Sequence, residues 1–102
     1  MVECPTPINL NFMGMALLGV GAGSKPLPIL NFYRKANGLA GEFNRARKYA
    51  LKGKKEKAYK TIETLEKDIN IYLQKEQSAY SIIFAQMQGK VDELKNYLDT
   101  LS

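Results

Sequence analysis

Apolar side chains recur at helical spacing along most of this chain. One set has spacings of 4, 3 and 4 residues and consists of Leu39, Phe43, Ala46 and Ala50. These spacings place the four side chains on one face of a helix, which we expect to run from about Leu39 to Lys52.

Proline and glycine residues mark the expected helix ends. Pro28 suits the first turn of a short helix, and the pair Asn37-Gly38 suits a left-handed stop for it. Gly53 is expected to end the next helix. A third helix follows, because apolar residues again step by 4, 3, 4 and 3 while Lys and Glu occupy the outer positions. Its apolar residues are Ala58, Ile62, Leu65, Ile69 and Tyr72.

The apolar pattern is interrupted beyond Leu73 by the polar stretch QKEQS. Ser78 is a good cap for a new helix. No Gly or Pro marks this break, however, so one continuous helix from Lys54 to Gln88 is the alternative. Gly89 is expected to stop the chain again. The helix before it carries Ala79, Ile82, Ile83 and Met87, and the helix after it carries Val91, Leu94, Leu98 and Leu101.

These elements predict an all-α fold of four to five short helices, arranged as two stacked helical hairpins with an apolar N-terminal arm. Residues 1–27 form the Gly- and Pro-rich arm, and residues 28–102 form the helical-hairpin domain. A chain of 102 residues is long enough for one modest core. The expected core residues are Phe43, Ala46, Ala58, Ile62, Leu65, Ile69, Ile83, Leu94 and Leu98.

Two segments match at a shift of 36 residues, Leu51–Glu66 and Met87–Ser102. Their identical pairs are Gly53 and Gly89, Lys54 and Lys90, Thr64 and Thr100, and Leu65 and Leu101. A glycine shared between two helices at such a period is typical of helical-hairpin repeats, whose units bury their apolar stripes against each other.

The stretch ARKYALKGKKEKAYKTIETL places a small, an aromatic, a turn-glycine and a small residue in order, at Ala46, Tyr49, Gly53 and Ala58. This order resembles the tetratricopeptide family and, more loosely, the pentatricopeptide family, over residues 38–102. The second unit keeps Gly89 but has Ala85 and Leu94 at the aromatic and small positions. The resemblance implies stacked helix pairs that serve as a binding scaffold, and it implies no specific ligand.

The run INLNFMGMALLGVGAG, residues 8–23, contains no charged residue. It is shorter than the roughly 20 apolar residues of a spanning helix. Glu3 with no preceding Lys or Arg argues against a secretory signal peptide, and the lack of Arg before Arg34 argues against a mitochondrial transit peptide. The run is open to three interpretations: cover for its own core, burial in a partner protein, or insertion at a membrane surface. The expected partner contacts are Leu10, Phe12, Met13, Met15, Leu17, Leu18, Phe32 and Tyr33.

The net charge of +5 is concentrated in the middle of the chain. The predicted basic patch consists of Arg45, Arg47, Lys48, Lys52, Lys54, Lys55, Lys57 and Lys60. Such a patch is a solvated helix surface, a contact for an acidic protein or anionic lipid, or a phosphate-binding surface with Tyr49 and Tyr59 interleaved.

The sequence contains few of the residue types that catalytic and metal sites use. The chain has no His and a single cysteine, Cys4, which excludes an intramolecular disulfide and a His/Cys zinc site. The run GVGAG lacks the Lys-Ser/Thr ending of a phosphate-binding loop. We therefore expect no catalytic residue, cofactor or metal. The lone cysteine favours an intracellular protein, organellar or membrane-associated forms included, over a secreted one.

The function that follows is a non-catalytic structural or accessory subunit. Its apolar arm and helical faces would dock it into a larger protein assembly, with an anionic membrane surface as a further target. The alternative from another class is a basic helical module that binds nucleic acid through residues 45–60.

Overall fold

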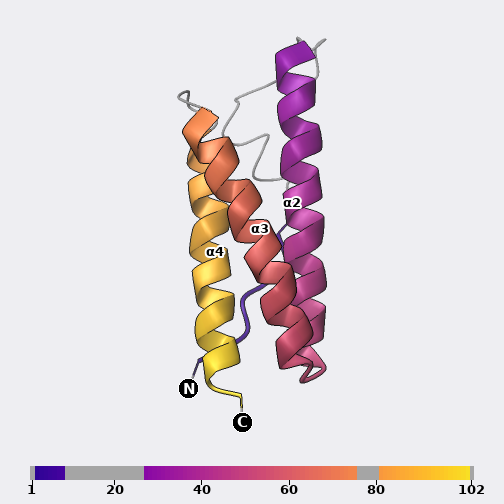
Figure 1. Cartoon of the computed structure of the whole chain (residues 1–102), viewed down its shortest axis with the longest axis vertical. Helices are drawn as coiled ribbons and strands as arrows, with labels where there is room; N and C mark the ends of the chain where they lie inside the picture. Colours follow the sequence, from indigo (N-terminus) through magenta and orange to yellow (C-terminus); the bar gives the residue numbers. More distant parts are fainter. Residues whose placement is uncertain (1, 9–26, 76–80, 102) are drawn as a thin grey trace.

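The computed structural model describes residues 2–8, 27–75 and 81–101, which form three α-helices and no strand. Helix α2 spans Leu27–Leu51, α3 spans Lys55–Lys75 and α4 spans Ser81–Asp99. The helices lie side by side, with α2 and α4 running in one direction and α3 in the other (Figure 1). The all-α prediction is confirmed for these residues, but the predicted four to five short helices are replaced there by three long ones.

Each helix turns an apolar stripe toward a shared core. Every predicted core residue is buried, and no polar or charged side chain is buried among the described residues. Full burial of one Leu, Ile or Phe side chain contributes roughly 1.5–3 kcal/mol, so these stripes supply most of the stabilisation. The core consists of Ile8, Ala36, Leu39, Ala40, Phe43, Ala46, Ala50, Ala58, Ile62, Leu65, Ile69, Ile83, Phe84, Met87, Val91, Leu94 and Leu98.

Helices α2 and α3 are joined by a tight turn at Gly53. The N–H of Lys54 donates to the carbonyl of Tyr49 at 2.8 Å, and the N–H of Gly53 donates to that of Ala50 at 3.0 Å. This pair of bonds is a Schellman motif, and it requires the left-handed backbone that Gly53 adopts at φ 76°. The predicted helix end at Gly53 is therefore confirmed.

Two other predicted helix ends are wrong. Helix α2 continues through Asn37-Gly38, and α4 continues through Gly89. Both glycines are exposed and lie off the apolar stripe of their helix, while buried residues continue the stripe on either side. An interior glycine costs about 1 kcal/mol relative to alanine, which is less than the burial that a continuous stripe provides.

Helices α3 and α4 pack against each other, so the alternative of one continuous helix over residues 54–88 is wrong. Glu66 of α3 accepts a hydrogen bond from Gln88 at 3.0 Å and forms a salt bridge with Lys95 at 3.3 Å. The rings of Tyr72 and Phe84 lie 5.4 Å apart between their centroids. Ser78 and Ala79, the predicted cap and first apolar residue of the next helix, lie outside the described residues.

The apolar face of α4 differs in detail from the predicted one. Phe84 is fully buried, whereas Ile82, which we expected on the stripe, is 46% exposed. Leu101 lies beyond the end of α4 and is half-buried against the core.

The 36-residue match does not correspond to a structural repeat of the turn. Gly53 ends a helix with a left-handed backbone, whereas Gly89 lies inside α4. The predicted hairpin with its turn at Gly89 is therefore replaced by the single helix α4. The tetratricopeptide resemblance itself stays a prediction.

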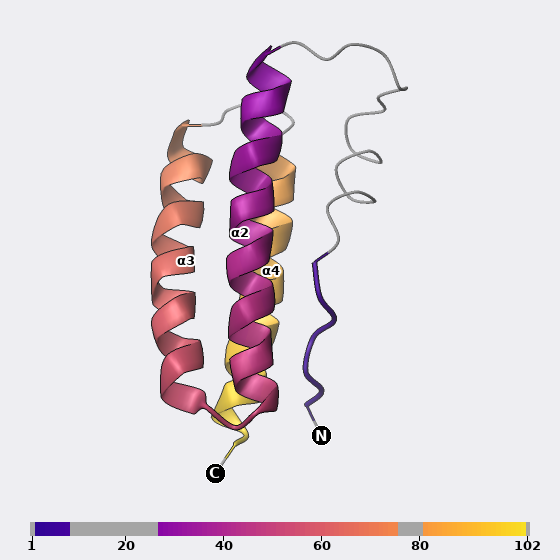
Figure 2. The ribbon, with the colours of Figure 1, turned by 90° about the vertical axis from the view of Figure 1, so that its right-hand side faces the viewer.

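The start of the predicted arm lies against the helices. Residues 2–8 form neither helix nor strand, and they run along α2 and α4 on the side opposite α3 (Figure 2). Ile8 and Pro5 are buried there.

Candidate interaction surfaces

The predicted basic patch lies where α2 ends and α3 begins. Six of its side chains are exposed and two are half-buried. The exposed ones are Arg45, Lys48, Lys52, Lys54, Lys57 and Lys60, and the half-buried ones are Arg47 and Lys55. The turn at Gly53 therefore brings the two basic runs of the sequence together at one end of the bundle.

The two half-buried members of the patch have structural partners. Arg47 Nε donates to the carbonyl of Pro5 at 2.7 Å, and Lys55 Nζ donates to the carbonyl of Leu101 at 3.4 Å. Each bond ties a chain end to the bundle. Arg47 and Lys55 are accordingly less available to a partner than the six exposed side chains.

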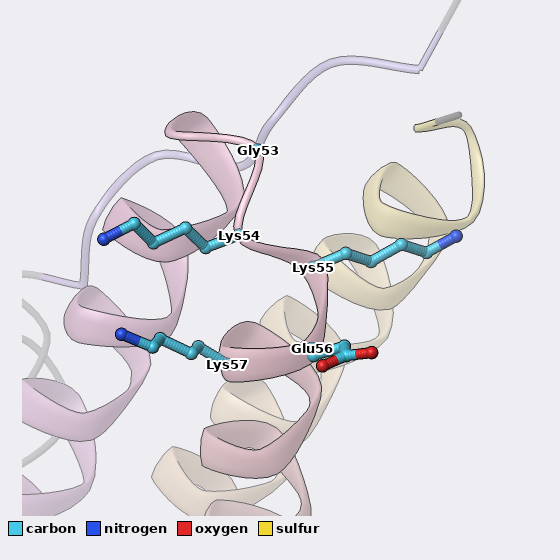
Figure 3. Close-up of a pocket in the computed structure, with 5 residues that line it drawn as sticks. All are labelled: Gly53, Lys54, Lys55, Glu56 and Lys57. Carbon is cyan, nitrogen blue, oxygen red and sulfur yellow. The ribbon is translucent and has the colours of Figure 1, made fainter.

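An open hollow lies at the turn and is lined by Gly53, Lys54, Lys55, Glu56 and Lys57. Lys54 and Lys57 extend to one side of it, and Lys55 and Glu56 extend to the other (Figure 3). The side with Lys54 and Lys57 carries positive charge without an adjacent carboxylate in this group. Glu56 lies in the first turn of α3, where its charge complements the helix dipole.

The tyrosines interleaved with the patch are engaged within the protein. Lys57 Nζ lies 5.9 Å from the centroid of the Tyr49 ring. The hydroxyl of Tyr59 donates to Asp99, and this hydrogen bond raises the pKa of Tyr59. Neither ring is a free stacking platform, so the patch is suited to phosphate or carboxylate contacts more than to base stacking.

The exposed basic side chains form no salt bridge within the described ranges, although the charge of Arg45 acts on the carboxylate of Glu42. The salt bridge found among residues 2–8, 27–75 and 81–101 joins Lys95 and Glu66, away from the patch. A surface of unpaired lysines binds polyanions through charge and therefore discriminates little between sequences.

The second surface is the seat that α2 and α4 form for residues 2–8. The side-chain amide of Asn44 accepts from the N–H of Ile8 at 2.9 Å and donates to the carbonyl of Ile8 at 3.3 Å. Lys90 Nζ of α4 donates to Thr6 Oγ1 at 2.8 Å. With the bond from Arg47 to Pro5, these contacts hold an extended peptide on the helix surface.

The sequence analysis did not identify this seat. Asn44 follows the core residue Phe43, and a polar amide at the edge of an apolar stripe needs a hydrogen-bonding partner. Pro5 and Pro7 favour an extended backbone around Thr6. Both signals are present in the sequence, but Ile8 and Asn44 are 36 residues apart, and local patterns do not indicate which distant segments contact each other.

The predicted partner contacts of the apolar arm lie outside what the structure describes. Leu10, Phe12, Met13, Met15, Leu17 and Leu18 belong to residues 9–26, which are not described. Phe32 and Tyr33 lie in α2, but their side chains are not among those described.

Other potentially reactive groups are few. Burial raises the pKa of the Cys4 thiol more than Arg47 lowers it, so Cys4 is held as a neutral thiol. Glu42 has a buried Oε2 without a hydrogen-bonding partner; burial, and secondarily the charge of Asp68, raise its pKa. The described residues contain no group of three or more metal-ligating side chains. None of their helices is both long and apolar enough to cross a membrane.

Comparisons with protein families, with curated proteins and with solved structures find no match to this chain.

Proposed function

We propose that this protein is a non-catalytic structural or accessory subunit that docks into a larger assembly through the apolar run that follows Ile8, residues 9–23. The observation that carries the proposal is that the nearest described residues on the two sides of this run belong to the folded bundle. Asn44 bonds the backbone of Ile8, and α2 begins at Leu27.

The geometry of the attachment points supports this proposal. Asn44 and Leu27 are separated by 17 residues of α2, or roughly 25 Å of helix rise. The connection of 18 residues, from 9 to 26, spans up to about 60 Å when extended. It is thus much longer than the gap. Its residues 9–23 carry no charge, so their transfer from water to an apolar partner is favourable.

The surface of the helices also supports the proposal, because its exposed apolar side chains are scattered. All three helices bury their apolar stripes against each other and against Ile8, and the described large apolar side chains that stay exposed are the scattered Val2, Leu51, Ile71 and Ile82. Single exposed apolar residues are ordinary on protein surfaces. The apolar run is accordingly the best candidate in the chain for partner contact.

A replacement of residues 9–23 by a Ser- and Gly-rich segment of equal length tests the proposal. We expect the chain with the replaced segment to retain the helix content and unfolding midpoint of the native chain. We expect the native chain, but not the replaced one, to self-associate and to bind an apolar dye such as ANS. Flotation with anionic vesicles separates a lipid target from a protein target. A native chain that is monomeric, dye-negative and vesicle-negative, like the replaced chain, would contradict the proposal.

The second candidate function is binding of nucleic acid by the basic patch. The observation in its favour is the set of six exposed basic side chains that form no salt bridge in the described part of the chain. The engagement of Tyr49 and Tyr59 limits this function to sequence-independent phosphate contacts.

Salt dependence tests the second candidate. We expect the affinity for a short duplex to fall steeply with salt, and the double change Lys54→Gln and Lys57→Gln to lower the slope of log K against log salt by about 0.9 for each lost contact. The matched control is Lys35→Gln with Lys67→Gln, which removes the same charge elsewhere. Equal effects of the two pairs would show that the patch is not a binding surface.

A further inference from the structure

One face of α2 carries a row of basic residues that is interrupted by two glycines. At 3.6 residues per turn the positions of the row fall within an arc of about 80°, so they share one side of the helix. All of them are exposed, and we call this row the outward face of α2. It consists of Arg34, Gly38, Gly41, Arg45, Lys48 and Lys52.

The outward face contains neither an acidic nor an apolar side chain. Glu42, the one acidic residue of α2, lies outside the arc, and the charge of Asp68 on α3 acts on it. A stable protein interface and a helix embedded at a membrane surface both bury apolar side chains at their centre. A phosphate backbone requires only positive charge. The composition of this face therefore favours a nucleic acid as its ligand.

The two glycines divide the basic residues into two groups. Arg34 lies 11 residues before Arg45, which is roughly 16 Å along the helix axis. Between them a Cβ added at Gly38 or Gly41 would meet no atom within 4 Å, so the surface there is open. The major groove of B-DNA is about 12 Å wide and has a phosphate backbone along each edge. The spacing of the two groups therefore suits contact with both backbones, and the glycines let the helix approach the groove between them.

A neighbouring tyrosine favours a duplex over a single strand. Proteins that bind single strands stack the bases on aromatic rings. Tyr49 adjoins the outward face, but Lys57 Nζ lies 5.9 Å from the centroid of its ring. The face therefore offers charge to the outside of a duplex and no free ring to an unpaired base.

We propose that the outward face of α2 lies across the major groove of a DNA duplex, with Arg34 on one phosphate backbone and the group from Arg45 to Lys52 on the other. This proposal rests on the second candidate function. It adds the face that makes contact, the duplex form of the ligand, and Arg34, which lies outside the predicted basic patch.

Two neighbouring charges of α2 give a matched test in the intact chain. Arg34→Gln should weaken binding of a labelled duplex of about 20 base pairs by roughly eightfold at about 0.1 M salt, and lower the slope of log K against log salt by about 0.9. Lys35→Gln removes the same charge from the side of α2 that faces Tyr72, whose ring centroid is 5.3 Å from Lys35 Nζ. It should leave both quantities nearly unchanged. Fluorescence anisotropy at several salt concentrations measures them.

A second pair of variants tests the close approach without any change of charge. Gly41→Leu places a bulky side chain on the outward face and should lower the affinity for the duplex. Gly89→Leu makes the same change on the exposed surface of α4 and should not. Both positions have open space for the new side chain, and circular dichroism confirms that helix content is retained.

The outcomes separate this proposal from the function on which it rests. Equal effects of Arg34→Gln and Lys35→Gln overturn the crossing of the groove by α2, and the second candidate function then depends on the test of Lys54 and Lys57 alone. A native chain that does not bind the duplex at low salt overturns both. Tighter binding to a single strand, to an RNA duplex or to phosphatidylserine vesicles, with the same dependence on Arg34, overturns duplex DNA as the ligand.

Discussion

Gly53 and Gly89 stand in the same local sequence, Gly-Lys, and yet have opposite effects on the chain. Gly53 ends α2 with a left-handed backbone, whereas α4 passes through Gly89 unbroken. The apolar stripe explains the difference. Between the buried Ala50 and Ala58 no buried residue continues the stripe, while Met87 and Val91 continue it on either side of Gly89. In this chain a glycine therefore ends a helix only where no further apolar side chains need the helix to continue in order to be buried.

The largest expected effect comes from breaking the stripe itself. Phe43 is fully buried in α2, and the helix continues through Gly38 and Gly41 just before it. Phe43→Ala should destabilise the protein by about 3–5 kcal/mol, because it removes a large side chain and leaves a cavity. Urea unfolding followed by circular dichroism measures the loss. A loss under about 1 kcal/mol would show that burial does not hold α2 together across its glycines.

The turn glycine gives the next largest effect. Gly53→Ala forces a Cβ into a left-handed backbone and should cost about 1–2 kcal/mol, although no neighbouring atom lies within 4 Å of the added carbon. Gly53→Asn is the matched control, since asparagine tolerates this conformation better. Equal stability of Gly53→Ala and the native chain in the same urea experiment would remove the distinction between the two glycines.

The next effect concerns Glu42, a charged residue next to the buried Phe43 in α2, and its influence on stability as a function of pH. Burial raises the pKa of Glu42, so its charged form is less stable in the folded protein than in the unfolded chain. The protonated Glu42 contributes to the free energy of unfolding, and this contribution is intact below the ordinary pKa of glutamate, about 4.3. It is lost as the pH rises toward and through the raised pKa of the folded state.

Glu42→Gln should accordingly stabilise the protein at pH 7, and the gain should shrink as the pH falls to 4 and both states bind the proton. Unfolding midpoints at pH 4, 5, 6 and 7 measure it, with Glu63→Gln, an exposed position on α3, as the control. A gain that is independent of pH would contradict the assignment of the effect to the ionisation of Glu42.

The smallest effect is expected at the helical glycine, and its sign is opposite to that at the turn. Gly89 is exposed inside α4 and has open space where a Cβ would lie. Gly89→Ala should stabilise the protein by about 0.5–1 kcal/mol, because alanine loses less conformational entropy in a helix. A destabilisation in the thermal melt would mean that Gly89 has a hinge role that the continuous helix does not reveal.

Much of the core could be read from spacing alone. Ile62, Leu65 and Ile69 follow the helical period and are buried as predicted, because a side chain's face depends only on its position along a regular helix. The helix ends were less predictable. Asn37-Gly38 and Gly89 carry local stop signals whose strength, about 1 kcal/mol, is small beside the burial energy of the surrounding stripe.

The basic patch was predictable as a set of residues but not as a surface. Its eight members are adjacent in the sequence, so their proximity follows from the turn at Gly53. That Arg47 and Lys55 bond Pro5 and Leu101 depends on where the two chain ends lie, 42 and 46 residues away in the sequence. Contacts over such separations have no signature in local periodicity.

The sequence by itself determined that the chain is helical, which faces are apolar and where charge collects, because these properties follow from the order of residues along a regular helix. Only the tertiary structure decided which glycines end a helix and that Asn44 holds Ile8. Those outcomes depend on the balance between local backbone preference and burial against distant segments, and that balance exists only once the helices have packed.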